Sequence, residues 1–193
     1  MHSWQALPEA VLHSVGPIST ALIDRGAANF RTAGRYLHQL PYGRNTNRAD
    51  FRLVLTEGRG TCSTKHALLA ELARERHLSV VLTLGIYEMH ERNTLGVGPV
   101  LDKYELSYLP EAHCYLTYEG MRIDVTRSGM GPTEPIRQFL HEEAITPEQI
   151  GNYKIRLHQQ FLRQWVTNTA LTHRLSFEEI WRIREECITE LTQ

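Results

Sequence analysis

Cysteine is scarce in this 193-residue chain, which carries only Cys62, Cys114 and Cys187. A small, odd set of cysteines argues against a disulfide framework and favours a reducing compartment. The chain also lacks the basic and apolar amino-terminal regions of a signal peptide. Its best apolar run, residues 80–87, is far too short to cross a bilayer. These absences predict a soluble, cytoplasmic protein with no membrane partner.

An excess of one charge is missing as well, because 21 Lys and Arg stand against 22 Asp and Glu. This balance provides no basic field for nucleic acid, so we expect no nucleic-acid partner. The ten histidines form no His-x-x-x-His pair with a carboxylate partner, and no Asp-rich calcium loop is present. We therefore expect neither a metal nor a cofactor. The length fits one domain with a sizeable core.

The hydrophobic pattern predicts a mixture of helices and strands. Apolar residues recur near a 3.6-residue period over residues 17–40, which predicts a helix. Residues 50–55 fit either a short helix or a strand. A second helix is predicted from Thr61 or Cys62 to about residue 77, and it is apolar nearly all round, which places it in the middle of a domain. Residues 79–87 predict a buried strand.

Two interpretations fit residues 88–110. They form either a long functional loop or a connection that contains a strand at 103–108. The carboxy-terminal third is predicted to be helical, at about 147–169 and 177–191, and both segments begin with capping-box residues. We expect these two helices to pack as an antiparallel pair.

A β-hairpin is predicted over residues 113–126, with a two-residue turn at Glu119-Gly120. In this register Tyr115 faces Asp124, and His113 lies diagonal to Asp124 on the same face. The β-carbons of His113 and Asp124 would then be roughly 5 to 8 Å apart. A carboxylate at that distance accepts a hydrogen bond from one imidazole nitrogen and leaves the other nitrogen for a thiol. A three-residue turn would break this arrangement.

Cys62 follows Gly60-Thr61 and opens the predicted central helix. At a helix amino terminus, the unpaired N–H groups and the dipole favour a thiolate and bind an oxyanion beside it. Gly60 lets the backbone approach a substrate closely. The simpler interpretation is a buried, inert cysteine on a core helix, as most lone cysteines are.

Taken in order, these motifs resemble those of the transglutaminase-like superfamily of papain-like cysteine enzymes, over about residues 42–126. The matching residues are Gly60-x-Cys62 with Leu68-Leu69, then Ala112-His113, then Asp124-x-Thr126. The resemblance implies an α+β, papain-like core in which a central helix packs on an antiparallel sheet. It implies one domain over 1–193, with a core at about 40–128, an amino-terminal helical segment and a helical extension at about 133–193.

The resemblance also implies a catalytic triad: Cys62 as the nucleophile, His113 as the general base and acid, and Asp124 as the residue that orients His113. The implied reaction is acyl transfer at an amide of a peptide or protein, through a thioester. It covers transglutaminase, deamidase and cysteine peptidase types and leaves the second nucleophile open. The alternative is a catalytically inactive protein-binding module with the same fold. A small-molecule acyltransferase is a third possibility.

A second oxyanion donor is expected from the loop before the central helix, where Tyr42, Asn45 and Asn47 are the candidates. The asparagines would equally serve the turn. Tyr115 is a further candidate for contact with the substrate, because it is the aromatic residue nearest after His113.

His66 follows Cys62 by four residues and shares its helical face, so it is a rival base. We prefer His113, because a partner on the same helix points along that helix and not across a cleft. Lys65 is a candidate for electrostatic support of the thiolate, but we expect a solvated surface lysine.

Overall fold

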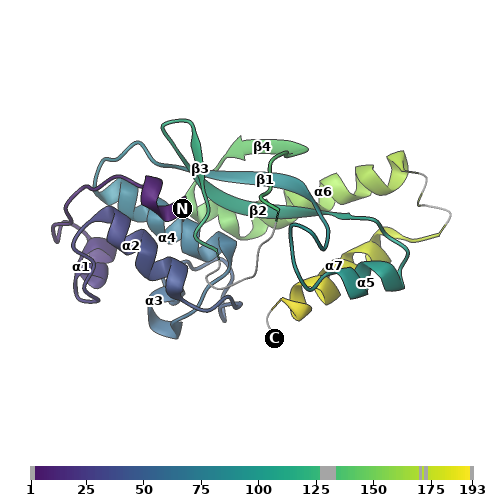
Figure 1. Ribbon diagram of the computed structural model, residues 1–193, viewed down its shortest axis with the longest axis horizontal. Coiled ribbons are helices and arrows are strands. Elements are labelled where there is room, and N and C mark those ends of the chain that lie inside the picture. Colours follow the sequence, from purple (N-terminus) through teal and green to yellow (C-terminus); the bar gives the residue numbers. More distant parts are fainter. Residues whose placement is uncertain (1–2, 127–133, 170, 172–173, 192–193) are drawn as a thin grey trace. The chain divides into compact units, whose positions relative to one another are not determined.

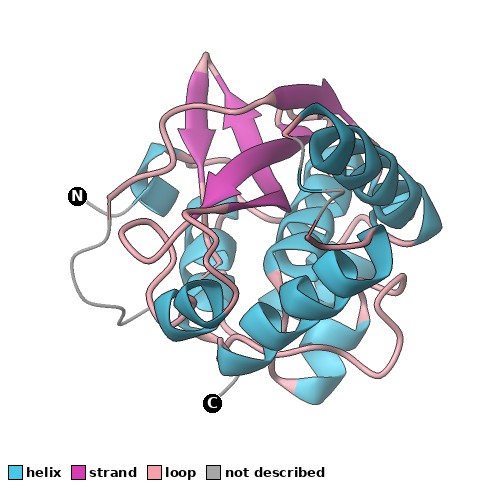
Figure 2. Cartoon of the chain, turned by 90° about the vertical axis from the view of Figure 1, so that its right-hand side faces the viewer, coloured by secondary structure: helices cyan, strands magenta, loops and turns pink. Residues whose placement is uncertain are grey.

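A computed structural model describes residues 3–126, 134–169, 171 and 174–191. Within these residues the protein has an α+β fold, with seven α-helices and one four-stranded antiparallel sheet (Figure 1 and Figure 2). The α+β class predicted from the sequence is thereby confirmed. The predicted boundaries at 128 and 133 lie outside the described residues.

The helices and strands follow one another without a repeated unit. In chain order they are η1 (Ser3–Ala6), α1 (Pro17–Ile23), α2 (Phe30–Gln39), α3 (Leu53–Glu57), α4 (Cys62–Glu75), β1 (Val81–Met89), α5 (Gly98–Lys103), β2 (Leu109–Tyr118), β3 (Met121–Ile123), β4 (His141–Ala144), η2 (Pro147–Ile150), α6 (Asn152–Asn168) and α7 (Phe177–Glu190). The strand order in the sheet is β3-β2-β1-β4.

The chain divides into two compact units that alternate along the sequence. The first consists of Met1–Leu84, Cys114–Gly129 and Glu143–Gly151, and the second of Gly85–His113, Met130–Glu142 and Asn152–Gln193. Strands β1, β2 and β4 contribute residues to both units, whereas β3 belongs to the first.

Helix α4 forms the centre of the first unit. Helices α1, α2 and α3 pack against it together with η2, and Figure 1 shows the amino-terminal helices gathered around it. It also packs on β2. Every α4 residue from Cys62 to Ala73 is buried except Glu71. The prediction of a central helix is therefore confirmed, and burial on all sides is the reason for its continuous apolar run.

The predicted helix over 17–40 is wrong in one respect, because two helices occupy this segment. Helix α1 ends at Ile23, and Gly26 then adopts a φ of 85°, a left-handed conformation that glycine adopts without steric cost. Asn29 begins α2, since its side chain accepts a hydrogen bond from the N–H of Thr32 at 2.8 Å. The turn at Gly26 and the cap at Asn29 thus divide the segment into two helices, although its apolar residues recur with one helical period.

Residues 88–110 match neither interpretation of the sequence. They contain helix α5, and β2 begins only at Leu109, so the strand predicted at 103–108 is wrong. The Glu91 carboxylate accepts hydrogen bonds from the N–H groups of Gly96 and Gly98, at 3.0 and 2.6 Å, and fixes the turn that leads into α5. Residues 50–55 run into helix α3, which resolves the choice between helix and strand.

The carboxy-terminal helices agree with the prediction, except that Gly151 divides the first of them and that strand β4 lies in the extension predicted to be helical. Thr146 precedes η2, Gly151 separates η2 from α6, and Ser176 caps α7 by accepting from the N–H of Glu179. Helices α6 and α7 pack on each other. Their apolar faces enclose the core of the second unit, which includes Leu162, Trp165, Ile180 and Ile183.

Candidate active site

Cys62 is the first residue of the 14-residue helix α4, and it is 8% exposed. Thr61 precedes the helix in an extended conformation, and its N–H donates to the hydroxyl of Thr64 at 3.0 Å. The first N–H groups of such a helix have no intrahelical acceptor and carry positive partial charge. Cys62 therefore opens the helix, as predicted, although its side chain is largely covered, and the ionisation of its thiol stays a prediction.

The loop before α4 is held tightly against the helix. The Gly60 N–H donates to the Pro41 carbonyl, and the Gly43 N–H donates to the Gly60 carbonyl, each at 3.2 Å. A β-carbon on Gly60 would lie 2.9 Å from Val54 Cγ2 and 3.0 Å from Lys65 Cγ. Gly60 is thus required by internal packing, a reason that is not visible in the sequence.

The two asparagines of this loop serve its turn, as one interpretation predicts. The buried Asn45 amide donates to Glu57 Oε2 and to the Arg59 carbonyl, each at 3.0 Å, and accepts from the Thr64 hydroxyl at 2.8 Å. Asn47 accepts from the N–H of Ala49 at 3.0 Å. Both residues hold the loop backbone in place with their side-chain amides.

Lys65 corrects an expectation. The residue was predicted to be a solvated surface lysine, but its side chain is fully buried. Its Nζ donates to the carbonyl of Leu40 at 2.6 Å and to the carbonyl of Thr126 at 2.8 Å. Lys65 therefore ties the first turn of α4 to two segments, one before the helix and one after β3.

His66 is fully buried, and both of its ring nitrogens have backbone partners. The Val125 N–H donates to Nε2 at 2.8 Å, so Nε2 carries a lone pair. The proton of the neutral ring is then on Nδ1, which lies 2.7 Å from the Cys62 carbonyl and donates to it. Neither nitrogen is available to take a proton from a thiol, so the interpretation of His66 as a rival base is not supported. His66 instead links the Cys62 backbone to the segment that carries Asp124.

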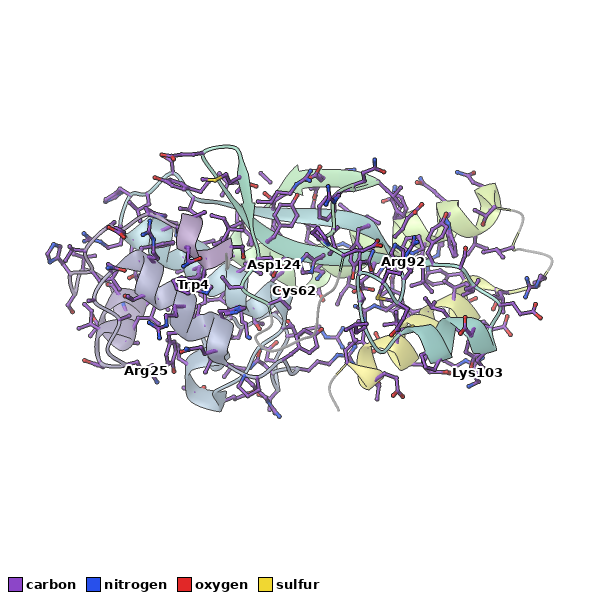
Figure 3. All side chains as sticks on the ribbon, in the orientation of Figure 1. Trp4, Arg25, Cys62, Arg92, Lys103 and Asp124 are labelled. Atoms are coloured by element: carbon purple, nitrogen blue, oxygen red, sulfur yellow. The ribbon has the colours of Figure 1, made fainter. Side chains whose placement is uncertain are left out.

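Asp124 follows β3, and its side chain is 44% exposed. Its Oδ1 accepts from the Thr126 N–H at 2.8 Å and lies 3.6 Å from His66 Nε2. The backbone N–H of Asp124 donates to the Ser3 hydroxyl at 3.2 Å, so η1 also holds this position. Cys62 and Asp124, both labelled in Figure 3, thus belong to one hydrogen-bonded framework through His66 and Val125.

The predicted turn and register of the hairpin are confirmed for three residue pairs, but β3 ends at Ile123, so the pairing of Tyr115 with Asp124 stays a prediction. Strand β2 pairs with β3 so that Tyr118 faces Met121 and Leu116 faces Ile123, which leaves Glu119 and Gly120 as the two turn residues. Both turn residues have positive φ, 49° and 75°, as a tight hairpin turn requires.

His113 is 9% exposed and is the last β2 residue of the second unit, whereas Cys62 and Asp124 belong to the first. The ring of Tyr87 meets its ring edge-on, with centroids 5.9 Å apart. The joint action of Cys62, His113 and Asp124 stays a prediction.

The two remaining candidates are both tyrosines. Tyr42 bridges to Gly60, which places its backbone beside the segment that leads into Cys62. Tyr115 is 2% exposed, and the guanidinium of Arg122 lies 6.0 Å from its ring centroid. Tyr115 therefore belongs to the interior of the first unit.

A buried ionic cluster surrounds Glu111, two residues before His113. The Arg184 guanidinium donates one hydrogen bond to each carboxylate oxygen of Glu111, at 2.8 and 2.5 Å. Burial on its own would raise the pKa of Glu111, but Arg184, His158 and Lys154 together lower it to about 2. Burial also lowers the pKa of His158. Sequence reasoning missed this cluster, because its members are far apart along the chain.

The low pKa of Glu111 predicts a loss of stability in acid. The carboxylate contributes stability above its unfolded pKa of about 4.5 and loses it as the pH falls towards 2. The shift corresponds to about 3 kcal/mol of unfolding free energy, and stability rises with pH in this window because the unfolded chain binds the extra proton. Urea unfolding of wild type and Glu111→Gln across this range should show a shallower pH slope for the variant. Glu178→Gln, at an exposed site on α7, should keep the wild-type slope; equal slopes in all three proteins would contradict the assignment.

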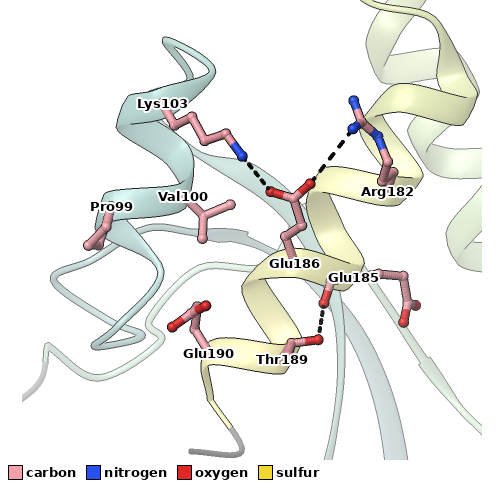
Figure 4. A pocket seen from close by; sticks show the side chains of 8 residues that line it. All are labelled: Pro99, Val100, Lys103, Arg182, Glu185, Glu186, Thr189 and Glu190. Carbon is pink, nitrogen blue, oxygen red and sulfur yellow. Dashed lines mark hydrogen bonds and ion pairs between the residues drawn. The ribbon is translucent and has the colours of Figure 1, made fainter.

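A surface hollow of about 520 Å³ lies between α5 and α7 (Figure 4). Three of its charged side chains pair with one another: Glu186 lies 3.3 Å from Lys103 and 3.9 Å from Arg182. The hydroxyl of Thr189 donates to the Glu185 carbonyl. These groups are satisfied without a ligand.

Two kinds of feature are absent from the part of the chain that the structure describes. None of the helices there is both long and apolar enough to span a membrane. No group of three or more His, Cys, Asp or Glu side chains is arranged there to hold a metal ion. All three cysteines are buried thiols, and burial raises the pKa of Cys187 to about 12.

The chain was compared with protein-family models, with curated proteins and with solved structures, and none of the three comparisons gave a match.

Proposed function

We propose that the protein is a thiol-dependent enzyme with a papain-like, transglutaminase-like core, which transfers an acyl group from an amide of a peptide or protein. The observation that carries the proposal is the position of Cys62, at the amino terminus of a buried central helix and linked through His66 to the Asp124 segment. A cysteine that only fills space in the core would not require hydrogen bonds between its backbone and the Asp124 segment. A reducing compartment, the cytoplasm, suits the three thiols.

The proposed reaction proceeds in two steps. The Cys62 thiolate attacks the amide carbonyl, and the carbonyl oxygen takes up negative charge near the first N–H groups of α4. His113 gives a proton to the leaving nitrogen as the C–N bond breaks, which leaves a thioester on Cys62. Water or a primary amine then attacks the thioester, with His113 as the base, and restores the thiolate.

Asp124 has the role of orienting His113 in this scheme. A carboxylate partner selects the imidazole tautomer and stabilises the charged ring. The carboxylate of Asp124 is itself fixed by the Thr126 N–H, and its backbone by Ser3 and the His66–Val125 bond. An orienting residue held by neighbours in this way costs little reorganisation during the reaction.

A peptide assay tests the proposal. A library of glutamine-containing peptides is incubated with the protein, with and without a primary amine, and the products are identified by mass spectrometry. Cleaved peptides would identify a peptidase, conversion of glutamine to glutamate a deamidase, and amine incorporation a transglutaminase. We expect one of these products, formed at a rate proportional to the concentration of the protein.

A further inference from the structure

Strand β2 brings two buried polar side chains to the same face of the second unit. Glu111 and His113 are two residues apart, and alternate residues of a strand point to the same side. Glu111 is 6% exposed and His113 is 9% exposed. An interaction that holds the Glu111 side chain in place therefore also restrains the β2 backbone next to His113.

Glu111 is held by a two-pronged ion pair from helix α7. Arg184 Nε donates to Oε2 at 2.8 Å, and Arg184 Nη2 donates to Oε1 at 2.5 Å. Glu185 in turn accepts from the other terminal nitrogen of Arg184 at 2.7 Å. The planar guanidinium thus donates to a carboxylate on each of two sides. These hydrogen bonds fix its orientation relative to Glu111.

The residue before Glu111 is anchored separately, from helix α6. His158 Nε2 lies 2.8 Å from the Pro110 carbonyl, to which it donates, and 3.9 Å from Glu111 Oε2. The ring of His158 packs edge-on against Trp181 of α7, with centroids 5.4 Å apart. Both carboxy-terminal helices thus hold the two positions that lead into His113.

Stability alone is a weak reason for such a cluster. Removing two charges from water is expensive, and an apolar pair of similar volume is often equally stable. An ion pair of defined geometry is distinguished by the direction that it imposes on the groups it joins. That property matters where a neighbouring side chain must be placed precisely.

We propose that Glu111 and Arg184 are positioning residues for His113, so that helix α7 is a working part of the enzyme. The proposal rests on the proposed function, in which His113 is the base. Because a misplacement of about 1 Å can cost a hundredfold in rate, loss of the pair should lower kcat about ten- to a hundredfold and leave KM nearly unchanged.

The decisive protein is the double variant Glu111→Met/Arg184→Met, which removes both charges together. We expect it to unfold at nearly the wild-type urea concentration, with the lowered kcat in the peptide assay and with shifted NMR signals of the His113 ring. Arg184→Lys keeps the positive charge but loses the paired hydrogen bonds to the two carboxylate oxygens. It should show a smaller decrease in kcat and smaller shifts of the His113 ring signals. Arg182→Met, which removes the exposed pair with Glu186 on the same helix, should match wild type in every measurement.

A double variant that folds and keeps both the wild-type kcat and the wild-type His113 ring signals would overturn the proposal. If the double variant does not fold, Arg184→Lys decides by the same two readouts. Failure of the proposed function looks different: the wild-type protein itself would form no product, and Cys62 would be as unreactive as Cys187. The His113 ring signals would still show whether the ion pair positions the ring.

Discussion

Replacement of Cys62 by serine should lower the rate of product formation in the peptide assay about a thousandfold or more, the scale seen when a nucleophile is lost. Serine has nearly the same shape, but its hydroxyl stays protonated near neutral pH, whereas a cysteine thiol at a helix start ionises readily. Serine is close to cysteine in size and fits the buried site, so the fold should tolerate the exchange. The measurement is the initial rate, together with the loss of any thioester adduct in the intact-protein mass.

The matched control is Cys187→Ala on α7. This thiol is buried and burial raises its pKa to about 12, so it takes no part in the proposed chemistry. The variant should keep the wild-type rate even if its unfolding midpoint falls. Equal product rates in Cys62→Ser and wild type would contradict the role of Cys62.

Replacement of His66 by leucine should destabilise the protein strongly. The variant leaves the buried Val125 N–H without a partner, which costs about 1 to 3 kcal/mol, and it removes the ring donor to the Cys62 carbonyl, which keeps its bond within α4. The loss of unfolding free energy should therefore be about 1 to 3 kcal/mol, measured by urea unfolding. Because the same bonds hold the segment after β3, Cys62 should also lose its selectivity in thiol labelling.

His13→Leu provides the comparison, because it makes the same exchange at an exposed position. It should change the unfolding free energy by less than about 0.5 kcal/mol. A His66→Leu protein as stable as His13→Leu would show that the two backbone bonds of His66 contribute nothing.

The hairpin and the central helix were predictable because local rules govern them. The Glu119-Gly120 turn fixes the register of β2 and β3 through two positive φ angles, which short turn sequences encode. The all-round apolar run of α4 likewise indicates burial wherever it packs. The break between α1 and α2 is local too, because Gly26 adopts the left-handed conformation there.

The roles of Lys65 and His66 could not be derived in the same way. Both are polar residues whose ordinary place is the surface, and their burial depends on carbonyl and N–H groups contributed by residues up to 61 positions away. Strand β4 was missed for a related reason, since its sequence, His141 to Ala144, is polar and only partly covered. Such features depend on tertiary contacts that no local pattern contains.

The pH dependence of Cys62 alkylation by iodoacetamide, compared between wild type and His113→Ala, tests the central claim most directly. It needs no knowledge of the substrate, and the buried Cys187 is an internal reference. We predict that Cys62 reacts fastest of the three cysteines, with a midpoint clearly below the free-thiol value of about 8.5, and that the midpoint rises in His113→Ala. A Cys62 that labels no faster than Cys114 or Cys187, or whose profile is the same in both proteins, would contradict the account.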